Sequence, residues 1–573
     1  MIDDSSAACG FARLPPSRHP STFHENSPYL FPRGAFHAPY TLWVVLGLLL
    51  LGSVASLLVD VRTASLLGNT LFLSATTCAI SLPLGTMLAW LLVRTDLPLR
   101  RAGLVLFGVM LFVPLYLQAA AWQAGFGIQG WYTLGYAGPV WLEGWTGAIW
   151  VHAMAALPWV VLIVGAGFWL VEPELEEQAL LDGSPWQVFR RVTLRGSLGA
   201  IGVAAIWVVI LTAGEMTVTD LFAVRTYAEE IYTRQAVGPQ PEDPRFGVMP
   251  GVILTTWLVL AGLVLLGKLA PGDRPASAGR RVAFPLGWWR GPMAAAVALA
   301  LVLVVGLPLG SLCYKAGIVV TQIDGVYVRS WSLGKCLLIV AEGPIRYDRE
   351  LGWSLVIGTL AATVSAALAT VLGWIARSGK LRASLVLVLT AVCLAVPGPI
   401  VGLGVIWLLN RPEIPLLVYL YDRSILAPVL ALAVRALGPA TLVMWHALRS
   451  IPPEMLDSAA VDGAGPVGQL CRIALPCRVW ALAVAWLVAL AIALGDLAAS
   501  VLVVPPGLAT LSIHIFNLLH YGIEDRVAGI CLALVALFAA VAAGVAWLAS
   551  RWGPPEADIP RSRTPNAAEP PEG

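Results

Sequence analysis

Two acidic residues stand inside long apolar runs of the sequence. Glu215 follows Gly214 and Asp496 follows Gly495, so a shift of 281 positions superposes one Gly-acid pair on the other. A carboxylate within a membrane is costly and usually faces the interior of a helix bundle or a water-filled path. Two interpretations stay open. The carboxylates line a translocation path or hold its gate, or they are internal struts bonded to neighbouring helices.

A second repeated set of charged groups lies in two polar loops, residues 173–195 and 453–476. Shifts of 280 and 281 positions superpose their prolines and their Asp-Gly pairs. Each pattern predicts a short helix, a break at Asp-Gly where glycine permits a turn, and a second short helix. Side chains able to make charge-assisted contacts are Glu177, Asp182, Arg190 and Arg191 in the first polar loop and Asp457, Asp462 and Arg472 in the second.

Trp186 and Phe189 are three residues apart, so we expect them on one face of the second short helix of the first polar loop, where they could anchor it. The alternative is that each loop is a solvated connector that binds nothing. A connector has no reason to repeat its Asp-Gly pair, which favours a binding role that includes Gly183 and Gly463.

The sequence contains no arrangement typical of an enzyme. It has no G-x-x-x-x-G-K-[ST] phosphate loop and no H-E-x-x-H motif, its seven histidines are dispersed, and its eight cysteines form no C-x-x-C pair. We therefore predict no catalytic activity, no cofactor and no metal site. A net charge of +2 says nothing about partners, and we expect no nucleic acid among them. Whether Cys313 and Cys336, in one predicted external loop, form a disulfide stays open.

The composition indicates a membrane protein. The chain of 573 residues is 58% hydrophobic and 12% charged, with a mean hydropathy of +0.79, and a soluble protein could not bury that much apolar surface. Runs of about 20 apolar residues are long enough to cross a bilayer as helices. The twelve predicted spans are 40–59, 67–93, 103–122, 146–171, 197–222, 247–269, 291–312, 351–376, 383–408, 425–448, 480–504 and 526–549.

The spans form two similar halves, 40–269 and 291–549, which we interpret as a tandem duplication. A shift of 284 positions superposes Ser81 on Ser365 and Trp90 on Trp374, matches that hydropathy alone does not explain. Six spans per half make the copies parallel, which argues against inverted-repeat carriers. The polar segments 1–39, 270–290 and 550–573 are expected to be a flexible tail, a linker and a disordered tail.

Basic residues predict the orientation. If both termini are cytoplasmic, 23 of the 36 Lys and Arg lie on the cytoplasmic side and 12 on the other, as the positive-inside rule requires. Both polar loops are then cytoplasmic.

The polar loops resemble the EAA loop of binding-protein-dependent ABC importer permeases, whose pattern is EAA, three residues, Gly, nine residues and Ile-x-Leu-Pro. The second polar loop matches this length with Asp457-Ser458-Ala459, Gly463 and Ile473-Ala474-Leu475-Pro476. The first has Glu177-Gln178-Ala179, Gly183 and Val192-Thr193-Leu194, is one residue shorter, and carries Arg195 where proline is usual.

The resemblance implies an all-α, polytopic inner-membrane protein made of two tandem, parallel type I permease repeats with about 12 transmembrane helices. In that family each EAA loop forms a coupling helix that sits in a groove of a cytoplasmic ATPase dimer. The family also implies a periplasmic or lipid-anchored solute-binding protein and contact with membrane lipid. Closure of the ATPase subunits on ATP would then open the central path alternately to each side.

A single chain with both permease halves most resembles the ferric-iron and thiamine importers. Ferric iron is the first cargo expected, thiamine the next, and other small solutes such as phosphonates or sulfate follow. A different class, an ion channel or ion-coupled carrier that needs no ATPase, would not explain the repeated Asp-Gly loop. A structural membrane scaffold would leave Glu215 and Asp496 unexplained.

Overall fold

The structure is a computed structural model, and it describes residues 61–98, 100–136, 140–169, 171–237, 284–323, 326–522 and 524–552. The predicted spans 40–59 and 247–269, the tail 1–39, and most of the linker and of the C-terminal tail lie outside the described residues.

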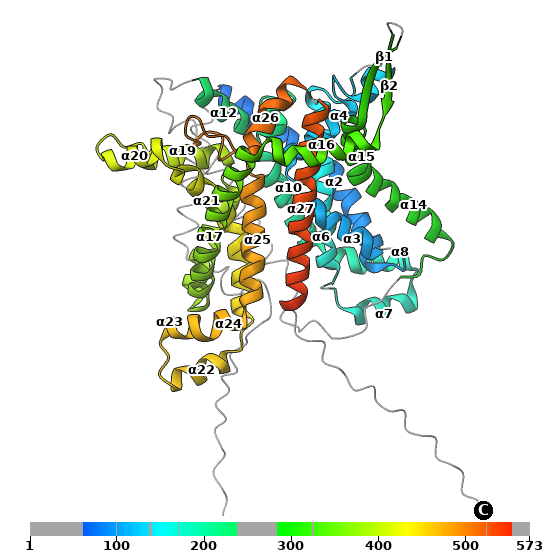
Figure 1. Cartoon of the computed structure of the whole chain (residues 1–573). Coiled ribbons are helices and arrows are strands. Elements are labelled where there is room, and N and C mark those ends of the chain that lie inside the picture. Colours follow the sequence, from blue (N-terminus) through cyan, green and yellow to red (C-terminus); the bar gives the residue numbers. More distant parts are fainter. Residues whose placement is uncertain are drawn as a thin grey trace, which may run out of the picture.

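The first half of the described chain forms only helices and begins with the long helix α2 (Figure 1). Its elements are α2 (Val61–Arg94), α3 (Arg100–Met110), α4 (Leu115–Phe126), α5 (Trp131–Tyr136), α6 (Gly144–Trp169), α7 (Pro173–Asp182), α8 (Pro185–Val188), the π-helical turn η1 (Phe189–Thr193), α9 (Leu194–Gly196), α10 (Leu198–Ala213), α11 (Thr217–Leu221) and α12 (Tyr227–Val237).

The second half follows a closely similar order and adds a β-hairpin. Its elements are η2 (Gly287–Trp289), α14 (Arg290–Leu301), η3 (Val302–Gly306), α15 (Leu307–Gly317), β1 (Ile318–Ile323), β2 (Val326–Trp331), α16 (Leu333–Arg346), α17 (Asp348–Arg377), α18 (Lys380–Ala395), α19 (Gly398–Leu409), α20 (Pro415–Arg423), α21 (Leu426–Arg449), α22 (Pro453–Val461), α23 (Pro466–Gln469), η4 (Leu470–Ala474), α24 (Leu475–Cys477), α25 (Val479–Gly495), α26 (Leu511–Tyr521) and α27 (Asp525–Trp552).

Among the described residues, six helices are long and apolar enough to cross a membrane, or up to ten spans if each of four bent helix pairs counts as one. The chain is therefore a predominantly helical, multi-pass membrane protein.

Two of the predicted spans are not straight helices. The runs 103–122 and 383–408 each bend by more than 100°, between α3 and α4 and between α18 and α19. Pro114 and Pro397 stand at these breaks with extended ψ angles of 148° and 144°, because proline has no N–H to donate and disfavours helical geometry in the residue before it. The apolar pattern continues through both breaks, so hydropathy alone concealed them.

Two further predicted spans end early as helices, and one predicted external loop is structured. The runs 197–222 and 480–504 leave the helix early, because α10 ends at Ala213 and α25 at Gly495. The predicted external loop between α15 and α17 contains an antiparallel hairpin, in which Ile318 pairs with Trp331, followed by the helix α16. This hairpin is a small addition to a described chain that is otherwise helical, as predicted.

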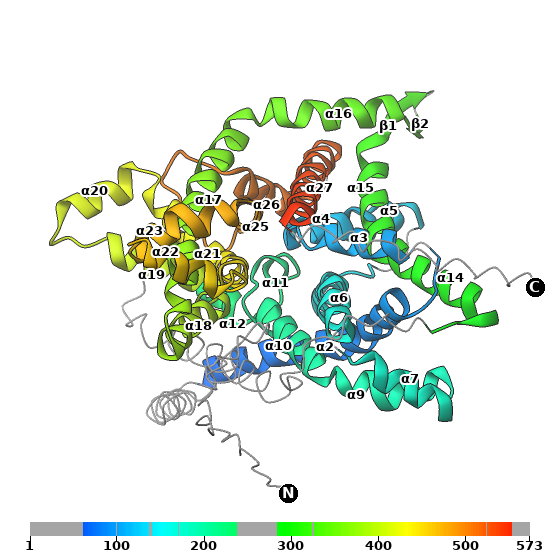
Figure 2. The same ribbon diagram turned by 90° about the horizontal axis from the view of Figure 1, so that it is seen from below.

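Two three-helix cores stand side by side (Figures 1 and 2): α2 with α6 and α10, and α17 with α21 and α25. Buried alanines such as Ala369 and Ala440 let the second core pack closely. The halves also interlock, because α15 and α27 pack against α4 of the first half. The two polar loops lie at one end of the molecule, and α12 and α26 lie at the opposite end (Figure 1).

The polar loops fold as the predicted pairs of short helices, but they turn differently. In the second polar loop, Gly463 has φ +85°, its N–H donates to Ala460 O, and the N–H of Ala464 donates to Ala459 O, which is a Schellman C-cap. Gly183 in the first polar loop has φ −144°, which any residue can adopt. Glycine is therefore required conformationally only in the second loop.

We predict that Gly463→Ala weakens the C-cap of α22, because a left-handed backbone costs an L-residue about 1–2 kcal/mol. Amide hydrogens at the end of α22 should exchange about 5- to 30-fold faster. Gly465→Ala is the matched control, since Gly465 has φ −68° and open space around its Cα. Equal exchange rates in both variants would contradict the assignment.

Candidate functional site

A cavity of about 590 Å³ lies between the two halves. Equivalent elements line it from each side: the α3–α4 bend, α6 and α10 from the first half, and the α18–α19 bend, α21 and α25 from the second. Its wall is mostly apolar and includes the Trp159 and Trp207 rings, whose centroids are 4.9 Å apart. Both Glu215 and Asp496 line this cavity.

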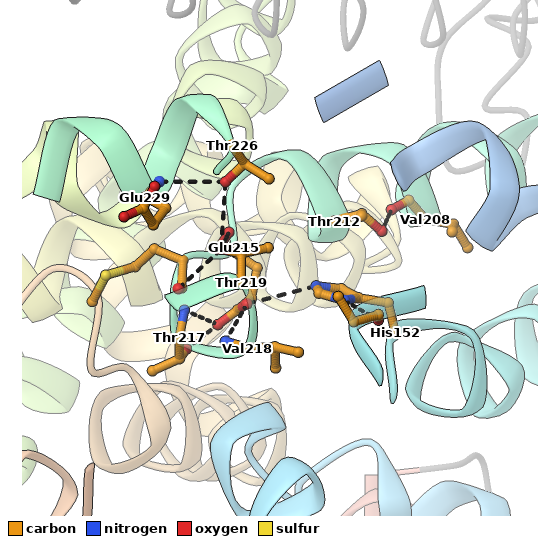
Figure 3. Close-up of polar contacts among 11 residues, drawn as sticks. His152, Val208, Thr212, Glu215, Thr217, Val218, Thr219, Thr226 and Glu229 are labelled. Atoms are coloured by element: carbon orange, nitrogen blue, oxygen red, sulfur yellow. Dashed lines mark hydrogen bonds and ion pairs between the residues drawn. The ribbon is translucent and has the colours of Figure 1, made fainter. Parts of the chain in front are cut away.

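Glu215 lies just beyond the end of α10 and caps the short helix α11 (Figure 3). It accepts hydrogen bonds from the N–H of Thr217 at 2.7 Å and the N–H of Val218 at 2.9 Å, and from the Thr217 hydroxyl. His152 Nε2 is 3.6 Å from Glu215 Oε2. The carboxylate therefore fixes the turn that follows α10 while it lines the cavity.

Asp496 occupies the same place after α25 but has a different partner. Its Oδ1 accepts the N–H of Ala499 at 2.9 Å, and its Oδ2 is 2.7 Å from Arg435 Nε. The same guanidinium donates to the carbonyl oxygen of Val396 at 2.9 Å. Arg435, which lies within a predicted span, thus ties α21 to the α18–α19 bend and to the acid of α25.

Each Gly-acid pair packs against the proline bend of the other half. A Cβ added to Gly495 would lie 2.7 Å from Pro114 Cγ, and one added to Gly214 would lie 3.7 Å from Pro397 Cα. The glycine before each carboxylate therefore allows close contact between the halves, most tightly at Gly495.

A small apolar plug lies next to the carboxylates. Met216 and Leu497, the residues that follow the two acids, cluster with Ala228 and Phe516, and all four are at most 2% exposed. The cluster combines residues of both halves on elements near α12 and α26. The two halves are therefore closed against each other at the end opposite the polar loops.

Sequence reasoning overlooked several cavity residues. His152 and Arg435 were not assigned a role at the site, yet they face Glu215 and Asp496 respectively. The repeated Val-Pro pairs at 113–114 and 396–397, in the middle of apolar runs, were the signal that could have located the bends.

None of the predicted loop residues lines the cavity, and the loop helices α7, α8, α22 and α23 lie toward one end of the molecule (Figure 1). Most are exposed: Glu177, Asp182, Arg190 and Arg191 in the first polar loop, and Asp457, Asp462, Gly463 and Arg472 in the second; Gly183 is half-buried.

The loops also expose apolar side chains at equivalent positions, of which the sequence analysis had named only Trp186, as an anchor of its helix. Leu181 is 86% exposed and Val461, 280 positions later, is 88% exposed. Trp186 and Val467 form a second exposed pair, at 51% and 74%. Each polar loop therefore presents two exposed apolar side chains at equivalent positions.

No group of three or more His, Cys, Asp or Glu side chains able to hold a metal occurs within the described ranges. Cys313 and Cys336 form no disulfide in this structure.

Residues 366–553 match the family model described as "Binding-protein-dependent transport system inner membrane component". The matched segment includes the second polar loop, Arg435 and Asp496. The match supports an ABC importer permease. Permeases of this family are transport subunits that work with separate ATPase and solute-binding proteins. No curated protein matches this chain.

One polar contact joins the halves beyond the plug. His520 Nε2 in α26 lies 3.1 Å from Asp220 Oδ2 in α11, and His520 Nδ1 lies 3.0 Å from the Phe516 carbonyl oxygen. Both partners are acceptors, so both ring nitrogens donate only when the imidazole is protonated. The hydrogen bond that His520 donates to Asp220 raises the pKa of His520 above its ordinary 6.5, although burial opposes the shift.

We predict that this contact stabilises the protein at acidic pH. Because the folded-state pKa of His520 is raised, the contribution is complete below about pH 6.5 and is lost as pH rises through that raised pKa. The pair is partly exposed, so it contributes at most about 1 kcal/mol. Thermal unfolding of the wild type and His520→Gln should differ more at about pH 5.5 than at about pH 8.5. An equal difference at both pH values would contradict this.

Proposed function

We propose that the chain is a fused, duplicated permease subunit of an ATP-driven ABC importer that moves a small solute by alternating access. The observation that carries this proposal is the cavity between two equivalent sets of elements. Each set ends in a Gly-acid pair that faces the cavity and packs on the proline bend of the other half. Such an interface can open and close as the halves rotate.

The translocation path of this proposal runs through the cavity past Glu215 and Asp496. Both carboxylates are held by backbone N–H groups, and Asp496 is also paired with Arg435. Each of these partners lies in the same half as the carboxylate it holds, so the path can open without breaking these contacts. The two carboxylates make the cavity wall polar next to the plug. In this mechanism the plug is the gate that closes the path on the side away from the ATPase.

Both polar loops are the docking sites for the ATPase dimer. Leu181 and Val461 supply apolar contact at their tips, and the exposed charges at Glu177, Asp182, Arg190, Arg191, Asp457, Asp462 and Arg472 supply charge-assisted bonds around it. The ATPase would hydrolyse ATP, and this chain would contribute no catalytic residue. In the orientation predicted from the basic residues, both loops and both termini are cytoplasmic and the plug faces the outside.

The proposed cargo is ferric iron, with thiamine as the alternative, and this order comes from the resemblance to fused permeases alone. Selection of the solute would fall to a binding protein that docks at the end of the molecule formed by α12 and α26.

We predict that Leu181→Glu together with Val461→Glu abolishes docking of the ATPase, because each places a charge in an apolar contact. Co-purification of the ATPase subunit with the full chain from detergent should fall by at least about tenfold. Val328→Glu, on the exposed hairpin at the other end, is the control and should retain the partner. If the ATPase co-purifies with the double variant as well as with the wild type, the docking assignment is contradicted.

We predict that deletion of the chain abolishes cellular uptake of radiolabelled ferric iron, and that excess unlabelled thiamine does not compete. If iron uptake is unchanged, iron is the wrong cargo, and the same strains are then tested with labelled thiamine. Loss of neither uptake would remove both cargoes, and ATP-independent uptake would replace the importer with a carrier.

A further inference from the structure

A buried ion pair joins the first polar loop to the base of α2. Arg94, the last residue of α2, pairs with Glu176 of α7, and their side chains are only 1% and 0% exposed. The other carboxylate oxygen of Glu176 accepts a hydrogen bond from Thr193 Oγ1 at 2.6 Å. One carboxylate therefore connects α2, the helix α7 and the π-helical turn η1 that leads into α10.

Aromatic packing surrounds this pair. Trp90, one turn before Arg94, lies 4.6 Å from Phe189 and 6.3 Å from Phe284, measured between ring centroids. Phe189 and Phe284 are buried, and the Phe284 N–H donates to the Arg94 carbonyl oxygen at 2.8 Å. Phe189 thus anchors the first polar loop to its own half, and the segment that enters the second half is attached at the same point.

The second polar loop lacks this ion pair. Leu456 stands 280 positions after Glu176 and is buried among apolar side chains that include Met444 and Leu448. Arg377 ends α17 as Arg94 ends α2, but it donates to the carbonyl oxygens of Leu448 and Ile451. Among the described residues, no ion pair involves Arg377. The second loop is held by apolar packing and backbone bonds instead.

Stability does not explain the difference. Burying two charges costs desolvation free energy, and an apolar replacement is often as stable or more stable. Leu456 shows that the equivalent position of this same fold accepts leucine. A charge pair differs from apolar packing in that its hydrogen bonds are directional, so it holds the joined elements in one geometry.

We propose that Arg94 and Glu176 are positioning residues that make the first polar loop and α2 move as one body, whereas the second loop shifts more freely against α17. This inference rests on the proposed coupling of the loops to an ATPase. The movement of the ATPase would then be transmitted to the permease mainly through the first half, where α2 packs on the cavity-lining helices α6 and α10.

The test uses the full chain reconstituted in proteoliposomes with its ATPase and binding protein. Arg94→Met with Glu176→Leu removes both charges together and so leaves no buried charge unpaired. This double variant should still bind the ATPase and hydrolyse ATP, but solute moved per ATP hydrolysed should fall at least about fivefold. Arg101→Met, which removes an exposed charge at the start of α3 and outside both polar loops, is the control and should leave that ratio unchanged.

The outcomes separate the two proposals. If the wild-type complex shows no ATP-dependent uptake, the proposed function fails. If the wild type couples and the double variant couples equally well, the positioning role is overturned. If the double variant does not insert, Arg94→Gln with Glu176→Gln, which keeps hydrogen-bonding side chains and also leaves no buried charge unpaired, is measured against the same criterion.

Discussion

The arrangement depends on a reciprocal contact between the two halves, in which the glycine of one half approaches the proline bend of the other. Gly495 has no room for a Cβ against Pro114, and Gly214 faces Pro397. The prolines turn the helices away from each other, so a cavity remains next to the contact. The glycines carry no side chain, so the two halves can approach closely at the contact itself. The acids that follow the glycines are therefore presented to a cavity rather than to lipid.

The two halves share the proline bend and the Gly-acid pair but differ in the side chains that contact them. Each proline bend leaves a carbonyl without its helical donor, and Gln118 donates to Val113 at 2.9 Å while Arg435 donates to Val396 at 2.9 Å. Glu215 faces His152, whereas Asp496 pairs with Arg435. The differences extend to the polar loops, where one half buries a charge pair and the other buries leucine. Under the proposed duplication, such divergence is allowed, since each half meets the other at one fixed interface.

Repetition in the sequence located much of the candidate site. The Gly-acid pairs and the Asp-Gly loops were identified because a polar residue that recurs at a fixed shift in an apolar chain is unlike its surroundings. The helix bends were missed, because apolar residues continue through Pro114 and Pro397. Arg435 could not be matched to Asp496, since 61 residues separate them and only packing brings them together. The exposed Leu181 and Val461 were missed because leucine and valine on a helix are ordinarily core residues.

The central claim is that the two ends of the molecule open in opposition, and paired distance measurements by spin labelling test it most directly. One label pair would replace Glu174 and Glu454, exposed at equivalent positions of the polar loops, and a second would replace Ile128 and Tyr521, exposed on opposite halves at the other end. With the ATPase bound, ATP should bring the first pair together and move the second pair apart. Distances that stay constant, or that change in the same direction, would contradict alternating access.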